Sequence, residues 1–281
     1  DWPPGAASRW WLHHSLTALS AGLQKLGSPL VIRRGASLAT LQALAAETGA
    51  AAVYWNRLYE PAAIARDARI KEALKAQGLT AQSFNGALLF EPWQLQTGSG
   101  TPYRVYSPFF RAQEARFGEL RALLPAPEKL QGAAKAPESE PLASLGLLPS
   151  IPWDAGFAAH WQPGEAGAQA RLERFAEKPI ATYKDLRDQP ALDGAVSGLS
   201  AHLHWGEISP NQVLVRANQA QGELTGAGAH GNIHHFVKEL AWREFSHHLL
   251  YHYPKTPAEP MYDKFARFPW REPADYASDL K

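Results

Sequence analysis

A short stretch of small residues in the second half of the chain could bind phosphate. Gly194, Ser197, Gly198 and Ser200 precede a helical pattern, so free backbone N–H groups and hydroxyl groups could gather on one side of this loop. Taken alone the pattern is weak, because ordinary loops that cap a helix carry the same residue types. A capped loop without a ligand is therefore the alternative interpretation.

A second stretch, residues 232–254, predicts a long helix with two different faces. At about 100° per residue, one stripe is apolar and forms the predicted core face: Ile233, Val237, Leu240, Ala241 and Phe245. The opposite stripe carries His235, Phe236, Glu239, Trp242, Arg243 and Ser246. Aromatic, acidic and basic side chains on one face could stack a base or a flavin and neutralise a phosphate. A solvated face with a single salt bridge is the alternative.

Other features favour a structural role over catalysis. Glu244 falls near the core stripe, where a carboxylate needs a partner, so we expect it in an ion pair. His230 with His234, and His248 with His252, lie four residues apart and could share a helix face. No HExxH motif or neighbouring carboxylate completes a metal site, so surface or capping histidines are the preferred interpretation. The sequence also contains no nucleophile elbow, P-loop or clean GxGxxG.

Alternating patterns predict how the N-terminal part is built. Helices are expected at residues 8–25, 38–48 and 61–77, and extended runs at 30–35, at 51–55 and up to Phe84. Buried-type strands that alternate with amphipathic helices are typical of a parallel sheet covered on both faces. The chain opens on a helix, whereas the first strand of a doubly wound sheet normally lies in its middle. We therefore expect that upstream sequence is absent.

The chain divides into three parts by residue composition and periodicity. Residues 1–90 form the α/β part, residues 91–165 a connector with its most linker-like run at KAPESEP, and residues 166–281 a helical part. Ser209 followed by Pro210 predicts a capped helix start. The predicted fold class is a Rossmann-like parallel α/β domain followed by an all-α domain, both incomplete.

Composition fits a globular intracellular protein. Hydrophobic residues make up 45% of the chain, and the formal charge of +1 excludes a uniformly basic binder while allowing a local basic patch. Ten Trp residues supply stacking surfaces as readily as core volume. The sequence contains no cysteine, no secretory signal pattern and no apolar run long enough to span a membrane. We expect a cytoplasmic protein without membrane contact.

Six blocks along the chain resemble the class I DNA photolyases of the photolyase and cryptochrome family. Besides the two stretches above, the similar blocks are WPPGAASRWWLHHSL, VYWNRLYEP, TPYRVYSPFFRA and FARFPW, in matching order and spacing. The resemblance covers essentially the whole chain. It implies an N-terminal domain for an antenna chromophore, either methenyltetrahydrofolate or a deazaflavin, and a helical domain that binds FAD.

The resemblance also implies site residues. Those that correspond to cofactor contacts are Tyr183, Val196, Ser197, Gly198, Leu199, Ser200, Phe236, Glu239 and Arg243. Those that correspond to DNA contacts are Arg187, Glu239, Trp242, Arg243 and Ser246, of which Glu239 and Trp242 are the expected catalytic pair. Asn56 and Glu60 match antenna-pocket positions, with polar residues at a strand end as the alternative. No metal is implied.

Three departures from the family pattern have consequences. Val196 stands where Thr is common, so one phosphate hydrogen bond is lost, worth about 1 kcal/mol. Ser246 stands where some members carry an aromatic residue, which weakens its expected lesion contact. The chain stops at Lys281, before the family's remaining FAD-binding segments and relay tryptophans, and it lacks the family's opening strand. We therefore expect a fragment that binds FAD poorly by itself.

The function implied by the resemblance is light-driven repair of cyclobutane pyrimidine dimers in DNA by electron transfer from reduced FAD. A flipped-out dimer would hydrogen-bond Glu239 and stack on Trp242, while Arg187 and Arg243 hold phosphates. Because the cofactor carries the chemistry, no protein nucleophile is needed. The expected form is a monomeric bacterial protein that acts at the nucleoid. Two alternatives remain: a cryptochrome-type blue-light photoreceptor without repair activity, and a nucleotide-binding or metal-assisted hydrolase built on the α/β part.

Overall fold

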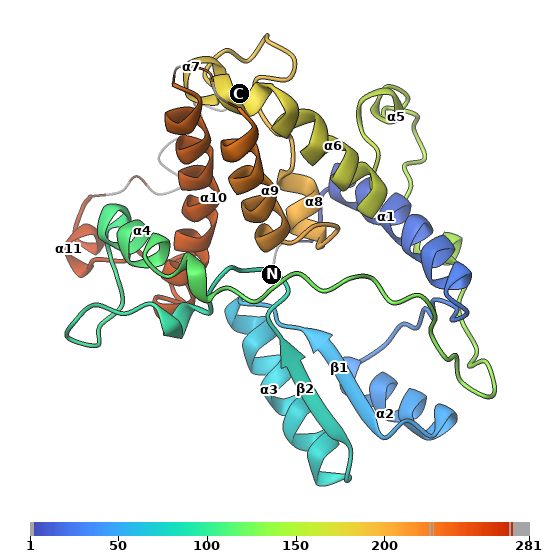
Figure 1. The fold of residues 1–281 in the computed structure, drawn as a ribbon. Coiled ribbons are helices and arrows are strands. Elements are labelled where there is room, and N and C mark those ends of the chain that lie inside the picture. Colours follow the sequence, from blue (N-terminus) through green and yellow to red (C-terminus); the bar gives the residue numbers. More distant parts are fainter. Residues whose placement is uncertain (1–2, 225, 227, 270, 272–281) are drawn as a thin grey trace.

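The N-terminal part combines helices with a small parallel sheet. The computed structural model describes residues 3–224, 226, 228–269 and 271 (Figure 1). The first elements are α1 (Ala6–Lys25), α2 (Ser37–Thr48), β1 (Ala52–Asn56), α3 (Pro61–Ala76) and β2 (Thr80–Phe84). β1 and β2 pair in parallel, with Ala52 opposite Thr80 and Asn56 opposite Phe84. The predicted α/β character of this part is confirmed.

Local signals begin and end these elements where the sequence predicts them. α2 ends before Gly49, whose φ of +67° lies in the left-handed region that favours glycine. α3 begins with Pro61, which tolerates the first helical position because the N–H there has no intrahelical partner. The core between α3 and β2 is small, and its buried members are Ile70, Leu74 and Ala81.

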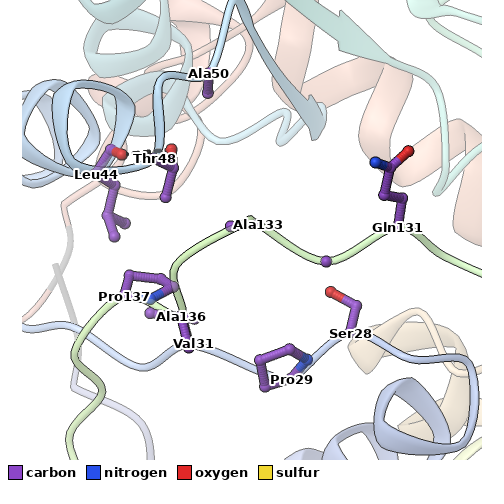
Figure 2. A pocket seen from close by; sticks show the side chains of 11 residues that line it. Ser28, Pro29, Val31, Leu44, Thr48, Ala50, Gln131, Ala133, Ala136 and Pro137 are labelled. Atoms are coloured by element: carbon purple, nitrogen blue, oxygen red, sulfur yellow. Dashed lines mark hydrogen bonds between the residues drawn. The ribbon is translucent and has the colours of Figure 1, made fainter.

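The extended run at residues 30–35 is not a strand of the described sheet, so the expectation of three strands is wrong. The N–H of Ile32 donates to Ser139 Oγ at 2.9 Å, and the Ile32 carbonyl accepts from the N–H of Glu140 at 2.9 Å. Because its backbone groups are used there, the run does not pair with β1 in the two-stranded sheet. A cavity of about 530 Å³ is lined by Val31 of this run and by Leu44 of α2 (Figure 2).

The second part is helical, as predicted. Its helices are α4 (Tyr106–Glu114), α5 (Phe157–His160), α6 (Glu165–Glu177), α7 (Tyr183–Leu186), α8 (Ser200–Trp205), α9 (Pro210–Glu223), α10 (Ala229–His252) and α11 (Asp263–Ala266). Short 3-10 turns lie at Pro92–Gln94, Phe117–Glu119, Leu142–Leu145 and Pro179–Thr182. The predicted start of α9 is confirmed, because Ser209 Oγ accepts the N–H of Gln212 at 3.2 Å. Among the described residues, no helix has the length and apolar character needed to cross a membrane.

The main core gathers around α10, which lies between α4 and α9 (Figure 1). Leu172 of α6, Val213 of α9 and Ile233 of α10 are each at most 1% exposed. Phe109 and Phe110 of α4 join the same core, although the sequence places them in the connector. Because α10 is packed along most of its length, its remaining face can hold side chains rigidly.

α1 packs against the helical part through Trp11. The Trp11 ring meets His202 of α8 edge-on at 4.9 Å, and its Nε1 donates to Glu207 Oε1 at 3.1 Å. Glu207 also accepts the N–H of Gly164 at 2.7 Å and bonds His202. Burial by itself would raise the pKa of Glu207. Its hydrogen bonds, of which the bond with His202 has the largest effect, outweigh burial and hold the pKa below the usual value. This buried polar cluster ties α1 to the helical part.

Candidate functional site

The side chain of Asn232 joins the start of α10 to α7. Its Oδ1 accepts the N–H of Lys184 at 2.6 Å, and its Nδ2 donates to the carbonyl of Gly228 at 3.1 Å. Gly228 has a φ of +83° and lies directly before the first residue of α10. These bonds place α7 beside α10, so Tyr183 of α7 lies close to Phe236 of α10.

Most of the predicted cofactor-binding residues line one cavity of about 420 Å³, which we call the α10 cavity. They are Tyr183, Ser197, Leu199, Ser200, Phe236, Glu239 and Arg243. We call residues 194–200 the serine loop. Val196 and Gly198 of this loop line a second, larger cavity beside α6, and Ser197 lines both cavities. The structure therefore brings seven of the nine predicted residues to the α10 cavity.

Phe236 and Tyr183 form an aromatic wall of the α10 cavity. Their ring centroids are 5.4 Å apart, and Phe236 also contacts Phe175 of α6 at 4.8 Å. Phe236 is only 5% exposed, although the sequence pattern places it on the open stripe. The reason is that α6 covers this side of α10. Burial raises the pKa of Tyr183, so its hydroxyl stays protonated at neutral pH.

Glu239 and Arg187 form an ion pair beside this wall. His235 Nε2 lies 3.6 Å from the same carboxylate oxygen, Oε1, that accepts from Arg187. The bond to Glu239 raises the pKa of Arg187. Within the described ranges, Oε2 of Glu239 has no hydrogen-bond partner, and the side chain is 31% exposed. One carboxylate oxygen is therefore free to accept a hydrogen bond from a ligand.

Glu244 is buried and contacts the guanidinium of Arg243, which is partly exposed, as expected for Glu244. Glu244 Oε2 accepts the N–H of Leu89 at 2.8 Å, and Arg243 donates to the Ala87 carbonyl at 2.6 Å. The two side chains are 3.4 Å apart. Burial raises the pKa of Glu244 to about 8 against the opposing effect of Arg243, and burial lowers the pKa of Arg243. Arg243 therefore lines the α10 cavity while it is tied to the backbone that leads out of β2.

Trp242 lies on the same face of α10 but does not line the α10 cavity. Its indole stacks on Tyr106 of α4 with centroids 3.7 Å apart and an interplanar angle of 8°. Tyr106 Oη donates to the Lys238 carbonyl at 2.6 Å, which anchors the stack to α10. Trp242 is still 44% exposed. Ser246 Oγ donates to the Trp242 carbonyl at 2.9 Å, so this hydroxyl is used within the helix.

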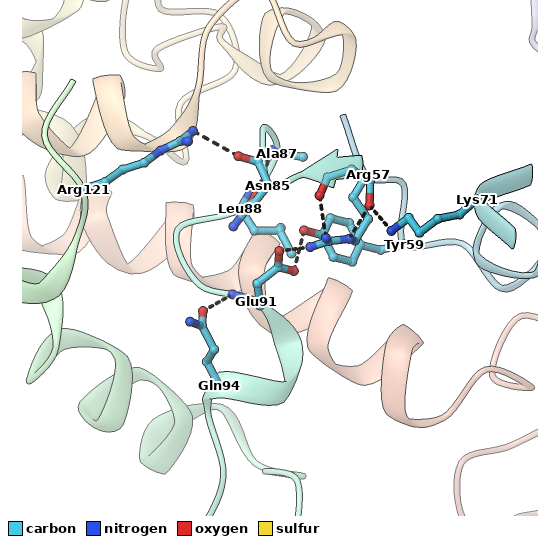
Figure 3. Close-up of polar contacts among 10 residues, drawn as sticks. Arg57, Tyr59, Lys71, Asn85, Ala87, Leu88, Glu91, Gln94 and Arg121 are labelled. Atoms are coloured by element: carbon cyan, nitrogen blue, oxygen red, sulfur yellow. Dashed lines mark hydrogen bonds and ion pairs between the residues drawn. The ribbon is translucent and has the colours of Figure 1, made fainter. Parts of the chain in front are cut away.

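Asn56 and Glu60 lie at the end of β1 and just before α3, and both are exposed. Between them, Arg57 and Tyr59 contact Glu91: Arg57 forms an ion pair with it, and Tyr59 Oη donates to it at 2.8 Å (Figure 3). Burial and the bond to Glu91 raise the pKa of Tyr59. The segment thus presents Asn56 and Glu60 to solvent while its other side chains hold the two parts of the chain together.

The histidines do not gather with other ligand types in the described residues, where no group of three potential metal ligands is found. His234 Nε2 instead bonds Glu114 at 2.7 Å. His248 is buried beside Phe109, and burial lowers its pKa to about 4, with His252 contributing. His234 therefore has a carboxylate partner, and His248 packs against the ring of Phe109.

Sequence reasoning missed two residues that shape the site. Asn232 opens the predicted helix, but only the fold reveals that it bonds α7. Tyr106 lies in the TPYRVYSPFFRA block, whose sequence gives no sign that α4 stacks on Trp242. Both contacts join segments far apart along the chain, so no local pattern could have found them.

Comparisons with known proteins identify the family of this chain. Residues 1–129 match the family model for DNA photolyase. Over 96% of its length the chain is 44% identical to the deoxyribodipyrimidine photo-lyase of Agrobacterium fabrum, of which it covers 55%. The chain belongs to the photolyase and cryptochrome family.

Two further relatives of this photolyase-family chain differ in kind. Cryptochrome-1 of Arabidopsis thaliana is 32% identical over 97% of this chain and 40% of that protein. The crystal structure of a bacterial class III photolyase from Agrobacterium tumefaciens superposes with a TM-score of 0.90 at 42% identity, covering 99% of this chain and 57% of that one. The chain therefore spans about half the length of the relatives it matches.

The family resemblance and the predicted fold class of this photolyase-family chain are thus confirmed. The narrower assignment to class I stays a prediction, and the structural relative from Agrobacterium tumefaciens is described as class III. The roles of the individual site residues also stay predictions.

Proposed function

We propose that this chain provides the flavin- and lesion-binding face of a light-driven enzyme that repairs cyclobutane pyrimidine dimers in DNA. The observation that carries the proposal is the α10 cavity, where Tyr183, Ser197 and Glu239 meet. Trp242 follows Glu239 along α10 and remains partly exposed. A cavity for a cofactor and a stacking surface for a base therefore lie on one helix.

The residues of the α10 cavity fit a flavin dinucleotide. Tyr183 and Phe236 offer aromatic surface, Ser197 and Ser200 offer hydroxyl groups, and Arg243 offers a positive charge. Such a mixture of apolar wall and few polar groups is typical of cofactor sites. Reduced FAD, when bound and excited by blue light, supplies the electron that splits the cyclobutane ring. The protein binds and orients the cofactor and the DNA and excludes water, which explains why no catalytic triad is needed.

Glu239 orients the lesion in this proposal. Its free Oε2 accepts a hydrogen bond from an N–H of a flipped-out pyrimidine, while Arg187 and His235 hold the carboxylate through Oε1. Arg187, which is also partly exposed, contributes positive charge toward the DNA backbone. Replacement by Gln keeps an acceptor oxygen but removes the ion pair with Arg187. Glu239→Gln is therefore expected to slow repair more than it weakens DNA binding.

Trp242 supplies the stacking surface for the lesion. Trp242→Ala is expected to weaken binding of dimer-containing oligonucleotide by about 1–3 kcal/mol and to leave binding of undamaged DNA nearly unchanged. Fluorescence anisotropy with matched damaged and undamaged duplexes measures both affinities. Trp93→Ala is the matched control, because Trp93 is 41% exposed and also contacts a tyrosine, Tyr251. Equal discrimination by the parent chain and Trp242→Ala would contradict this role.

A cryptochrome-type photoreceptor is the second candidate, since Cryptochrome-1 of Arabidopsis thaliana matches nearly the whole chain. Illumination of dimer-containing DNA with the chain and reduced FAD separates the two. Light-dependent loss of dimers, followed by chromatography of digested DNA, supports repair. Flavin binding without any loss of dimers supports the photoreceptor.

The antenna chromophore is assigned by resemblance to the surface around Asn56 and Glu60, both of which are exposed. An absorption spectrum of the purified chain with added methenyltetrahydrofolate tests this part. Asn56→Ala and Glu60→Ala should each reduce the bound pigment while flavin binding is unchanged. Unchanged pigment binding in both variants argues against this location.

A further inference from the structure

Glu244 follows Arg243 on α10 but does not line the α10 cavity. Its side chain is 2% exposed, whereas that of Arg243 is 23% exposed and lines the cavity. A buried carboxyl group costs free energy unless its contacts compensate for the loss of water. The proposed repair reaction leaves this buried group unused.

Two backbone contacts join Arg243 and Glu244 to the segment that leaves β2. Arg243 Nη1 donates to the Ala87 carbonyl at 2.6 Å, and Glu244 Oε2 accepts the N–H of Leu89 at 2.8 Å. Arg243 Nη1 also lies 3.4 Å from Glu244 Oε1. The carboxyl group therefore holds both the guanidinium and the backbone segment to which the guanidinium bonds. We call these three contacts the Glu244 clamp.

The Glu244 clamp is continuous with the polar contacts at the end of β1. One residue separates Leu89 from Glu91 along the chain. Glu91 forms an ion pair with Arg57 and accepts the Tyr59 hydroxyl at 2.8 Å (Figure 3). Asn85 Oδ1 accepts two backbone N–H groups near the start of the same segment. A short and firmly bonded segment therefore connects the sheet to the guanidinium in the α10 cavity.

Arg243 has donors that the clamp does not use. Nη1 makes its bonds to the protein, and within the described residues no acceptor is found for Nε or Nη2. An arginine stays charged in proteins, and its nitrogens donate to acceptor oxygens. These two nitrogens are therefore available to a ligand in the α10 cavity.

The Glu244 carboxyl group changes charge close to neutral pH. Burial raises its pKa to about 8 against the opposing effects of Arg243 and of its backbone bonds, and the charge of Glu91 adds to the rise. Tyr59 and His247 are the other titratable groups that act on Arg243. Burial raises the pKa of Tyr59 and lowers that of His247, so both stay neutral between pH 7 and 9. Glu244 is therefore mostly neutral at pH 7 and ionised at pH 9.

We propose that Glu244 is a positioning residue, which through the clamp sets how Arg243 donates to a ligand in the α10 cavity and links this donation to the end of β1. The proposal rests on the flavin site proposed above, because Arg243 lines that cavity. While Glu244 is neutral, it does not neutralise Arg243, whose charge is available to acceptor oxygens of the ligand. Once Glu244 ionises, the two groups attract each other more strongly and the ligand loses part of this interaction.

Quenching of riboflavin fluorescence between pH 6 and 9 tests the positioning role. Affinity of the parent should fall about threefold to tenfold from pH 7 to pH 9, because binding favours the protonated carboxyl group. Glu244→Gln keeps an acceptor for the N–H of Leu89 but cannot ionise, so it should match the parent at pH 7 and lack this fall. Glu207→Gln is the matched control, because Glu207 is also buried and accepts a backbone N–H, yet lies outside the lining of the α10 cavity. Its profile should follow that of the parent.

Arg57→Gln tests the link to the end of β1. The change removes the positive partner of Glu91, so the negative charge of Glu91 acts more strongly on Glu244. The midpoint of the riboflavin profile should then move to higher pH. Lys71→Gln is the control, because Lys71 bonds Ser83 beside Arg57 and makes no bond to Glu91. An unchanged midpoint in Arg57→Gln, or the same change in both variants, would overturn the link.

A measurement without ligand separates the clamp from the flavin site. The carbon-13 resonance of the Arg243 guanidinium carbon should titrate with a midpoint of about 8 in the parent and should not titrate in Glu244→Gln. If this titration is observed but no riboflavin binds, the proposed function fails while the clamp stands. A resonance that does not titrate in the parent, or that still titrates in Glu244→Gln, would overturn the clamp. An equal fall of riboflavin affinity in the parent and Glu244→Gln would overturn the positioning role.

Discussion

The helical part and the two-stranded part of the chain bury their side chains to very different extents. In the helical part, one cluster of buried residues runs from Leu89 to Phe245 and surrounds α10. In the α/β part, the corresponding cluster of described residues has only Ile70, Leu74 and Ala81 as buried members. This difference indicates that the α10 cavity depends on the large core of the helical part. The α/β part is joined to it by Trp11 of α1, which donates to Glu207, and by the polar contacts of Arg57 and Tyr59 with Glu91.

The largest expected effect comes from truncating a buried leucine in the core of the helical part, compared with the same change in the core of the α/β part. Leu214 of α9 and Leu74 of α3 are the same residue type, 2% and 0% exposed. Leu214→Ala is expected to lower the free energy of unfolding by about 2–5 kcal/mol and to abolish flavin binding, because the cavity it leaves adjoins the packing of α10. Urea unfolding and quenching of riboflavin fluorescence measure the two effects.

Leu74→Ala is the matched variant for this prediction. It should destabilise the α/β part by a similar amount and leave flavin affinity within about twofold of the parent, since none of the residues given for that cluster lines the α10 cavity. Loss of flavin binding in both variants would break the comparison, because it would mean that the two cores fold as one unit.

The next effect concerns Glu244, which bonds the backbone between the two parts. Burial raises its pKa to about 8, well above the value of 4.5 for an exposed carboxyl group, so the folded protein binds a proton that the unfolded chain releases. The stability from this proton is fully present below pH 4.5 and is lost as the pH rises toward 8. The slope is at most about 1.4 kcal/mol per pH unit.

Glu244→Gln isolates this contribution. Gln keeps an oxygen that can accept the N–H of Leu89 but cannot ionise, so the variant should show a flatter pH profile of unfolding between pH 5 and 8. Equilibrium urea unfolding at several pH values measures the slope for both proteins. An identical slope in parent and variant would assign the pH dependence to other groups.

Much of the fold follows from local pattern. The helix expected at 61–77 is α3 from Pro61 to Ala76, and the predicted cap at Ser209 starts α9. The prediction of a strand at residues 30–35 was wrong. The apolar residues of this run suit a strand, but its hydrogen bonds depend on residues 139 and 140 of a distant segment. Hydrophobic periodicity indicates which side chains will be buried, but it does not indicate which segment will form hydrogen bonds with the backbone.

The candidate site could be predicted only in part. The spacing of Glu239 and Arg243 on one helix face is a property of the sequence, and both line the α10 cavity. The ion pair between Glu239 and Arg187 and the place of Arg171 behind Gly198 depend on how α7 and α6 pack. Phe236 shows the same limit, because the helical period places it on the open stripe while Phe175 of α6 covers it.

The smallest expected effect concerns Tyr106, which lies close to the boundary between the two parts. Tyr106 comes from the stretch that the sequence assigns to the connector, yet it stacks on Trp242 and bonds the Lys238 carbonyl. Tyr106→Phe keeps the stack and loses the hydrogen bond, which should cost about 0.5–1.5 kcal/mol of stability. Tyr106→Leu also loses the ring contact, so the orientation of Trp242 is released and discrimination of dimer-containing DNA should fall about threefold to tenfold. Riboflavin binding should stay unchanged in both variants, since Tyr106 does not line the α10 cavity. Equal DNA discrimination by Phe and Leu variants would show that the stack holds the fold and does not orient Trp242.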